Sequence, residues 1–228
     1  MQEMDMVLGM DETKQEEDIL QIEDLSVSYN KGEPALKHVS LAVRKGSILV
    51  IVGESGSGKS TLIRAVAGLL SAGGEIEGGR ILFQQEDITQ HGASLMRSIR
   101  GSRIAMIFQD ARASLNPRRK IGSQFIESLR SSATLSAVDA RLIALAALAD
   151  IHVPDPLHVM NSYPFELSGG MCQRVTMAMA ISEFAQPKLL LADEPTSALD
   201  VTIQAQIIRR ILGYRERFGV SIAIQNYV

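Results

Sequence analysis

The chain has 228 residues, of which 46% are hydrophobic and 21% charged, and its formal net charge is −3 at pH 7. This length allows one domain with an inserted subdomain, and the slightly acidic balance argues against nucleic acid as the main partner, since nucleic-acid binders usually carry a basic face. A single cysteine excludes an internal disulfide. No stretch approaches the roughly 20 apolar residues that cross a bilayer, so a membrane role has to come through a partner subunit.

The first 18 residues carry seven acidic side chains against one lysine. They lack the apolar core of a signal peptide, and their composition is typical of a solvated segment. We therefore predict a disordered acidic tail over residues 1–18 and a folded domain over residues 19–228.

Two early segments have the pattern of strands. Residues 25–29 alternate apolar and polar side chains, as a half-buried strand does. Residues 47–52 form a continuous run that ends at a glycine, which predicts a strand buried on both faces, as in a parallel sheet. The chain then enters a glycine-rich loop, and residues 59–70 are expected to form a helix.

Further along, strands and helices alternate. Residues 79–83, 103–108, 188–192 and 219–224 have the pattern of strands, and residues 121–149 and 202–215 that of helices. Within the first helical stretch a wide apolar face is expected, made of Ala140, Leu142, Ile143, Leu145, Ala146, Ala149 and Ile151. The alternation predicts an α/β core with a parallel sheet, and the mostly helical segment at about 112–165 is expected to be an insertion.

The loop after the second strand matches the phosphate-binding pattern G-x-x-x-x-G-K-[ST] at every fixed position. Glycine lets successive backbone N–H groups point inward, and the helix N-terminus adds further donors for phosphate oxygens. Lys59 is expected to reach the β- and γ-phosphates and Ser60 to bind Mg²⁺. The nucleotide-binding residues predicted here are Gly53, Glu54, Ser55, Gly56, Ser57, Gly58, Lys59, Ser60 and Thr61.

Two carboxylates end the strand predicted at 188–192. Asp193 is suited to hold Mg²⁺, usually through water, because this ion keeps several waters of its octahedral shell. Glu194 is suited to polarise the attacking water. Residues 195–200, Pro-Thr-Ser-Ala-Leu-Asp, continue the motif.

Between these two motifs lies the sequence Leu-Ser-Gly-Gly at residues 167–170. The order of phosphate loop, glutamine, LSGG and DE resembles the ATP-binding subunit of an ABC transporter, from residue 19 onward. The resemblance implies a P-loop, RecA-like α/β ATPase core with a small antiparallel β lobe and an inserted α-helical subdomain. It also implies ATP and Mg²⁺ as cofactors.

The same resemblance assigns roles to further residues. Tyr29 would stack on adenine, and Gln109 would touch the metal and the attacking water and sense the membrane partner. Asp200 would lie at a dimer interface. The ATP held by the opposite subunit would be contacted by Ser168, Gly169, Gly170 and Met171, so that a monomer cannot complete a site.

A finer resemblance lies in residues 107–117, 163–166 and 198–206, which are similar to importers of oligopeptides, dipeptides and nickel. It implies a second ATPase subunit, two transmembrane permease subunits and, indirectly, a solute-binding protein, with the chain at the cytoplasmic face of the cell membrane. It implies no nucleic-acid partner.

The sequence departs from the family at its end. Members of the family carry a switch histidine after the last core strand, but Tyr227 stands there and Val228 follows; the histidines at 38, 91, 152 and 158 lie elsewhere. A tyrosine hydroxyl offers a single donor, so we expect impaired hydrolysis and a core without its C-terminal end. A truncated or frame-shifted product, a partial chain, and a degenerate subunit paired with a competent one all remain open.

Two other functions compete with the importer. The missing histidine favours a subunit that binds nucleotide but does not hydrolyse it. A non-transport ABC ATPase acting on nucleic acid or the ribosome is the other alternative. Such proteins often carry two cassettes, long coiled-coil arms or zinc-binding cysteines, whereas this chain has one cassette and one cysteine.

Overall fold

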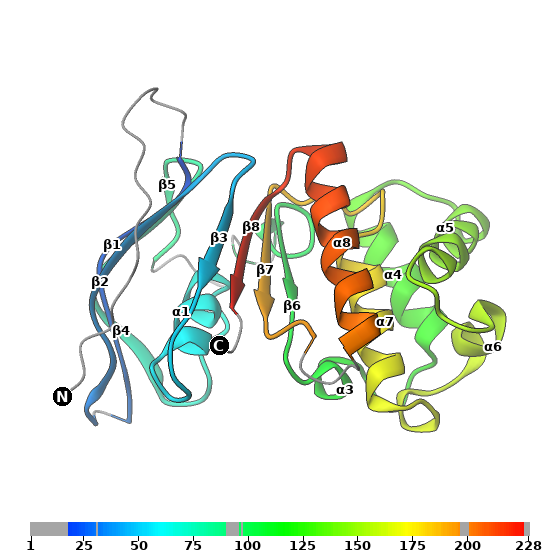
Figure 1. Cartoon of the computed structure of the whole chain (residues 1–228), viewed down its shortest axis with the longest axis horizontal. Coiled ribbons are helices and arrows are strands. Elements are labelled where there is room, and N and C mark those ends of the chain that lie inside the picture. The colour runs from blue at the N-terminus through cyan, green and yellow to red at the C-terminus, as the bar shows by residue number, and fades with distance from the viewer. Residues whose placement is uncertain (1–17, 31, 90–95, 97, 197–200, 226–228) are drawn as a thin grey trace.

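The computed structural model describes residues 18–30, 32–89, 96, 98–196 and 201–225 (Figure 1). An antiparallel sheet, a parallel sheet and a group of helices lie next to one another in that order along the long axis (Figure 1). Of the tail predicted at residues 1–18, residues 1–17 lie outside the described residues, as do Asp200 and Tyr227, while Asp18 lies in a strand.

The antiparallel sheet has the strand order β2-β1-β4-β5. Its strands are β1 (Asp18–Tyr29), β2 (Pro34–Arg44), β4 (Gly74–Phe83) and β5 (Glu86–Asp87). In β2, Val39, Leu41 and Val43 are buried while the residues between them are exposed. This alternation of period two packs one face of the sheet on a core and leaves the other in water.

The parallel sheet has the order β3-β8-β7-β6. Its strands are β3 (Ile48–Ile51), β6 (Ile104–Ile107), β7 (Leu189–Asp193) and β8 (Ser221–Gln225). The central strands β7 and β8 are buried along their whole length, as their apolar runs predict.

The prediction that the strand before the glycine loop is buried on both faces was wrong. Val50 is 54% exposed and Val52 42% exposed. The reason is the position of β3, which lies at the edge of the described parallel sheet and pairs there with β8.

Helices cover the two faces of the parallel sheet. On one face, α1 (Lys59–Val66) packs with Leu189 and Leu191 of β7; on the other, α8 (Val201–Phe218) packs with Leu190 and Ala192. Because successive side chains of a strand point to opposite faces, this division places the parallel sheet between the two helices. In the described residues no helix has both the length and the apolar character needed to span a bilayer.

The remaining helices share a separate core built around Phe125, Leu148, Val159 and Val175. They are α3 (Ala111–Ser114), α4 (Ile121–Ser132), α5 (Ala137–Asp150), α6 (Pro156–Asn161) and α7 (Gly169–Ala180), with a 3₁₀ turn at Pro164–Glu166 before α7. Figure 1 shows α4, α5 and α6 on the side of α8 that faces away from the parallel sheet.

The wide apolar face predicted for α5 was partly wrong. Leu142 is 61% exposed, and Ala146 and Ala149 are also exposed. The helix instead buries a narrow stripe of Ala140, Ala144 and Leu148, spaced four residues apart. The helix carries apolar side chains of its own around most of its circumference, so the periodicity of the sequence could not indicate which of them face the core.

Candidate nucleotide-binding and hydrolysis site

The glycine loop joins the end of β3 to the start of α1, as predicted. Gly56 has φ +83° and Gly58 φ +94°, which lie in the left-handed region that side chains disfavour. A Cβ on Gly58 would lie 2.6 Å from the Ala35 carbonyl oxygen, so the space also requires glycine. Gly58 caps α1 without a side-chain hydrogen bond, which leaves the first N–H groups of the helix to bind an anion.

The ammonium of Lys59 lies folded back over this loop. It donates to the carbonyl oxygens of Gly53 at 2.6 Å and Glu54 at 2.5 Å, and the residue is buried. An ammonium has three donors and no acceptor. Lys59 is therefore a cation held inside the loop, where phosphate oxygens can exchange for the carbonyls.

Ser60 and Asp193 meet beneath the loop. The Ser60 hydroxyl donates to Asp193 Oδ1 at 2.9 Å. Asp193 is fully buried, and its Oδ2 has no hydrogen-bond partner among the described residues, with the Arg64 guanidinium at 3.7 Å. A buried carboxylate oxygen without a hydrogen bond, beside a hydroxyl, is suited to a hard cation.

This oxygen set fits Mg²⁺. The described residues contain no group of three or more histidine, cysteine, aspartate or glutamate side chains that could hold a metal. Mg²⁺ usually takes one or two protein oxygens and fills the rest of its shell with water and nucleotide phosphates. Ser60 and Asp193 supply that number of protein oxygens.

Glu194 is held by two carboxamides. Gln109 Nε2 donates to its Oε2 at 2.7 Å, and Gln225 Nε2 donates to its Oε1 at 3.2 Å. The Glu194 backbone has φ +47°, a strained conformation that clusters at functional sites. Both oxygens are thereby fixed in orientation close to the loop.

Gln225 was not predicted from the sequence. It ends β8, opposite Asp193 in the parallel register, and it also hydrogen-bonds the Ser60 hydroxyl at 3.2 Å. The signal that could have found it is its position directly after the strand predicted at 219–224, since the carboxyl ends of neighbouring parallel strands lie at one edge of the sheet.

A cavity of about 220 Å³ contains most of these groups. Its lining is Ala35, Ser55, Gly56, Gly58, Lys59, Ser60, Thr61, Gln109, Glu194 and Gln225. The hydroxyl of Tyr29 lies 3.5 Å from that of Thr61. Residues separated by more than 160 positions in the sequence thus meet at one site.

The LSGG segment is not part of this cavity. Ser168 caps α7, its hydroxyl accepting from the Met171 N–H at 3.2 Å. Ser168 and Gly169 are exposed, and a Cβ on Gly169 would meet nothing within 4 Å. The predicted site residues therefore form two separate groups in one chain, the loop with the carboxylates and the open start of α7.

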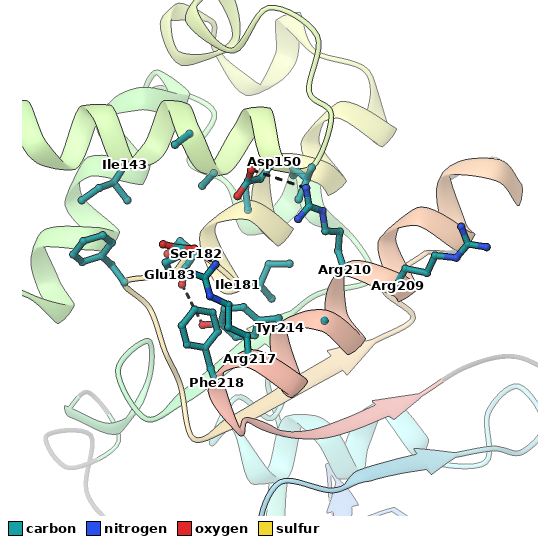
Figure 2. A pocket seen from close by; sticks show the side chains of 16 residues that line it. Ile143, Asp150, Ile181, Ser182, Glu183, Arg209, Arg210, Tyr214, Arg217 and Phe218 are labelled. Atoms are coloured by element: carbon teal, nitrogen blue, oxygen red, sulfur yellow. Dashed lines mark hydrogen bonds and ion pairs between the residues drawn. The ribbon is translucent and has the colours of Figure 1, made fainter.

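A larger cavity lies elsewhere. It measures about 520 Å³ and lies between α5, the end of α7 and α8, and none of the predicted site residues line it (Figure 2). Its lining shares no residue with the cavity at the phosphate loop.

The chain is similar to known proteins in sequence and in structure. Residues 36–197 match the ABC transporter family. The chain is 43% identical over 208 residues to the probable D,D-dipeptide transport ATP-binding protein DdpD of Escherichia coli K12, a match that covers 90% of this chain and 63% of the relative. It is 42% identical over 208 residues to the oligopeptide transport ATP-binding protein OppD of Bacillus subtilis 168, covering 90% of this chain and 58% of the relative.

Among solved structures, the ATP-binding cassette MJ0796, in a dimeric post-hydrolysis state bound to ADP and Pi, superposes with a TM-score of 0.81 at 26% identity. The match covers 91% of this chain and 87% of that one. The chain spans about three fifths of the length of the curated relatives it matches. With a phosphate loop, a buried Asp-Glu pair and an LSGG segment in this order on this fold, the chain belongs to the ABC transporter family.

Proposed function

We propose that this chain is the ATP-binding and ATP-hydrolysing subunit that drives an ABC importer of peptides or nickel-type solutes through ATP-driven dimerisation. The observation that carries the proposal is the convergence of Ser60, Asp193, Gln109 and Glu194 on the loop that holds Lys59. Each of these groups has a separate task in phosphoryl transfer.

The binding roles follow from the donor atoms. The loop N–H groups, the start of α1 and Lys59 bind the ATP phosphates, and Tyr29 packs against adenine. Mg²⁺ would be held by Ser60 and Asp193, with Gln109 beside it, and would neutralise charge on the phosphates when bound. The Oδ2 of Asp193, which accepts no hydrogen bond from the described residues, supports this placement.

Glu194 is the group that accepts a proton from the attacking water. Its two oxygens each receive one carboxamide N–H, from Gln109 and Gln225. An oxygen of a carboxylate has two lone pairs, so a carboxylate oriented in this way can also accept from water. We propose Gln225 as a further positioning residue for Glu194 and Ser60.

The LSGG segment acts on a second subunit. Ser168, Gly169, Gly170 and Met171 lie at the open start of α7, outside the loop cavity. Exposed N–H groups at a helix start suit the γ-phosphate of an ATP bound to the opposite subunit. Asp200 is proposed to lie at the interface. The dimeric state of the MJ0796 cassette supports a two-subunit site.

The solute and the membrane partners are inferred from relatives. DdpD is named as a probable D,D-dipeptide transport ATP-binding protein and OppD as an oligopeptide transport ATP-binding protein. We infer two transmembrane permease subunits and a solute-binding protein as partners, with this chain on the cytoplasmic face of the membrane. The 208-residue match to each relative supports a peptide solute more than nickel.

A second candidate is a subunit that binds Mg-ATP but hydrolyses it poorly. It is favoured by the tyrosine that stands at position 227 in place of a switch histidine. The histidines at 38, 152 and 158 are exposed and do not line the loop cavity. Removing one transition-state donor costs on the order of a hundredfold to a thousandfold in rate.

Nucleotide binding tests what the two candidates share. Titration with a fluorescent ATP analogue in Mg²⁺ is expected to give saturable binding, and Lys59→Ala is expected to weaken it by at least about tenfold, the cost of a lost charge-assisted hydrogen bond. Lys45→Ala, at an exposed lysine after β2, is the matched control. Equal binding by Lys59→Ala and wild type would contradict the proposal.

A further inference from the structure

The cavity between the helical group and the ATPase core has walls from three elements. These are α5, the C-terminal end of α7 with the residues after it, and α8 (Figure 2). Its volume of about 520 Å³ lies within the range of small-molecule sites. Ile143, Ile181 and several alanines give it an apolar lining.

An exposed glycine in the C-terminal half of α8 lines this space. Gly213 lines the cavity, and a Cβ built on it would meet nothing within 4 Å. Glycine is unfavourable inside a helix relative to alanine, and no neighbour requires its small size here. A side chain at 213 would project into free volume.

One buried polar atom at the cavity has no partner. Ser182 is 3% exposed, and its Oγ makes no hydrogen bond within the described residues. Its carbonyl oxygen is already used, since it accepts from the Tyr214 hydroxyl at 3.1 Å. Buried hydroxyls are normally hydrogen-bonded, so Ser182 Oγ carries an unused hydrogen-bond donor in the wall of the cavity.

The charged side chains at the rim have an excess of arginine. Arg217 pairs with Glu183, but Arg210 meets Asp150 only at 3.9 Å. For Arg209 no ion pair is found within the described residues. Figure 2 shows Arg210 and Asp150 together at one end of the cavity and Arg217 over Phe218 at the other.

We propose that this cavity is a binding site for a small amphipathic carboxylate. The apolar body would fill the space beside Gly213, and the carboxylate would accept from the Ser182 hydroxyl and the Arg210 guanidinium. Arginine can bind a carboxylate with two parallel hydrogen bonds. The 3.9 Å contact between Arg210 and Asp150 is too long for a hydrogen bond, so it leaves the guanidinium donors available for this purpose. This site is distinct from the nucleotide site and goes beyond the proposed function.

Occupancy of the cavity is expected to affect the nucleotide site, a consequence that rests on the proposed function. α7 starts at the LSGG segment and ends at the cavity. α8 starts a few residues after Glu194, and its Arg210 and Gly213 line the cavity. A ligand that contacts both helices favours one relative placement of them, and linkage requires that the effect be reciprocal.

Calorimetry with octanoate, without nucleotide, tests the site directly. Octanoate is expected to bind one-to-one, and 1-octanol, which lacks the charge, to bind at least about tenfold more weakly. Arg210→Gln should weaken octanoate by roughly tenfold and Ser182→Ala by roughly fivefold. Arg118→Gln, on an exposed loop, is the matched control.

Filling the cavity gives the sharpest result. Gly213→Leu should abolish octanoate binding, and Gly213→Ala, which suits a helix better than glycine, should weaken it while raising the melting temperature. Ala205→Leu, exposed on the same helix and outside the lining, should change neither. No binding at roughly millimolar octanoate, or binding that Gly213→Leu leaves unchanged, would overturn the proposal, and equal binding of octanol would overturn the carboxylate assignment.

The link to the nucleotide site has its own readout. Sedimentation of the full chain with Mg-ATP, with and without octanoate, should show a shift in the dimer fraction that Gly213→Leu abolishes. Octanoate binding with no shift would overturn the coupling and leave the site standing. Absence of any ATP-driven dimer would contradict the proposed function and not the site, because octanoate binding is measured without nucleotide.

Discussion

Gln225 at the end of β8 donates a hydrogen bond to Glu194 at the end of β7, with 3.2 Å between Nε2 and Oε1. The same carboxamide hydrogen-bonds the Ser60 hydroxyl, which in turn donates to Asp193. One side chain therefore connects the predicted base with the predicted metal ligand. Its position follows from the parallel pairing of β7 and β8, which sets residue 193 beside residue 225.

Gln225→Leu is expected to slow phosphate release by roughly tenfold, the loss of about one hydrogen bond to a charged group. Affinity for the ATP analogue should change little, because Lys59 and the loop N–H groups are untouched. Rate and affinity measured on the same preparation check this split. An equal loss in both would indicate a general structural effect and contradict a positioning role.

Gly58→Ala is expected to prevent nucleotide binding and to destabilise the fold. The new Cβ would lie 2.6 Å from a backbone oxygen, and φ +94° is strained for alanine. Gly219→Ala is the matched control, with φ +64° but no atom within 4 Å, so it should cost only the left-handed strain of about 1–2 kcal/mol. Chemical denaturation of both variants measures the difference, and equal costs would be evidence against the steric argument.

Asp193→Asn is expected to weaken the dependence of ATP-analogue binding on Mg²⁺ while leaving binding without metal nearly unchanged. The carboxylate loses the charge and the free oxygen that suit a divalent ion. Titrations with Mg²⁺ and with EDTA measure the two states. A variant with the same Mg²⁺ midpoint as wild type would show that the metal is held elsewhere.

Cys172 is expected to react slowly with thiol reagents in the folded protein. It is fully buried, and burial raises the pKa of its thiol despite the opposing effect of Arg112. The reactive thiolate is therefore scarce near pH 8. Because the folded pKa lies above the unfolded one, this residue's contribution to stability is present at neutral pH and declines as pH rises above the ordinary thiol range of about 8.5. A thiol reagent that reacts with Cys172 at the same rate in the native and in the unfolded protein would contradict the expected slow reaction.

The sequence predicted the α/β core because local patterns decide it. The glycine loop, the apolar run of β7 and the helix start at Lys59 each have a physical signature within about ten residues. The exposure of Val50 could not be predicted in this way, because only the strand order places β3 at an edge. The position of Gln225 at a strand end is visible in the sequence, but its contact with Glu194 is not, since that residue lies 31 positions away.

Hydrolysis by this chain is measured most directly as phosphate release from Mg-ATP by the full chain at high protein concentration, beside Glu194→Gln. Slow release is expected, at a rate that exceeds the Glu194→Gln rate and rises more steeply than linearly with protein concentration, because the LSGG segment acts on a second subunit. A rate equal to that of Glu194→Gln would contradict hydrolysis by this chain alone and leave the nucleotide-binding subunit as its function.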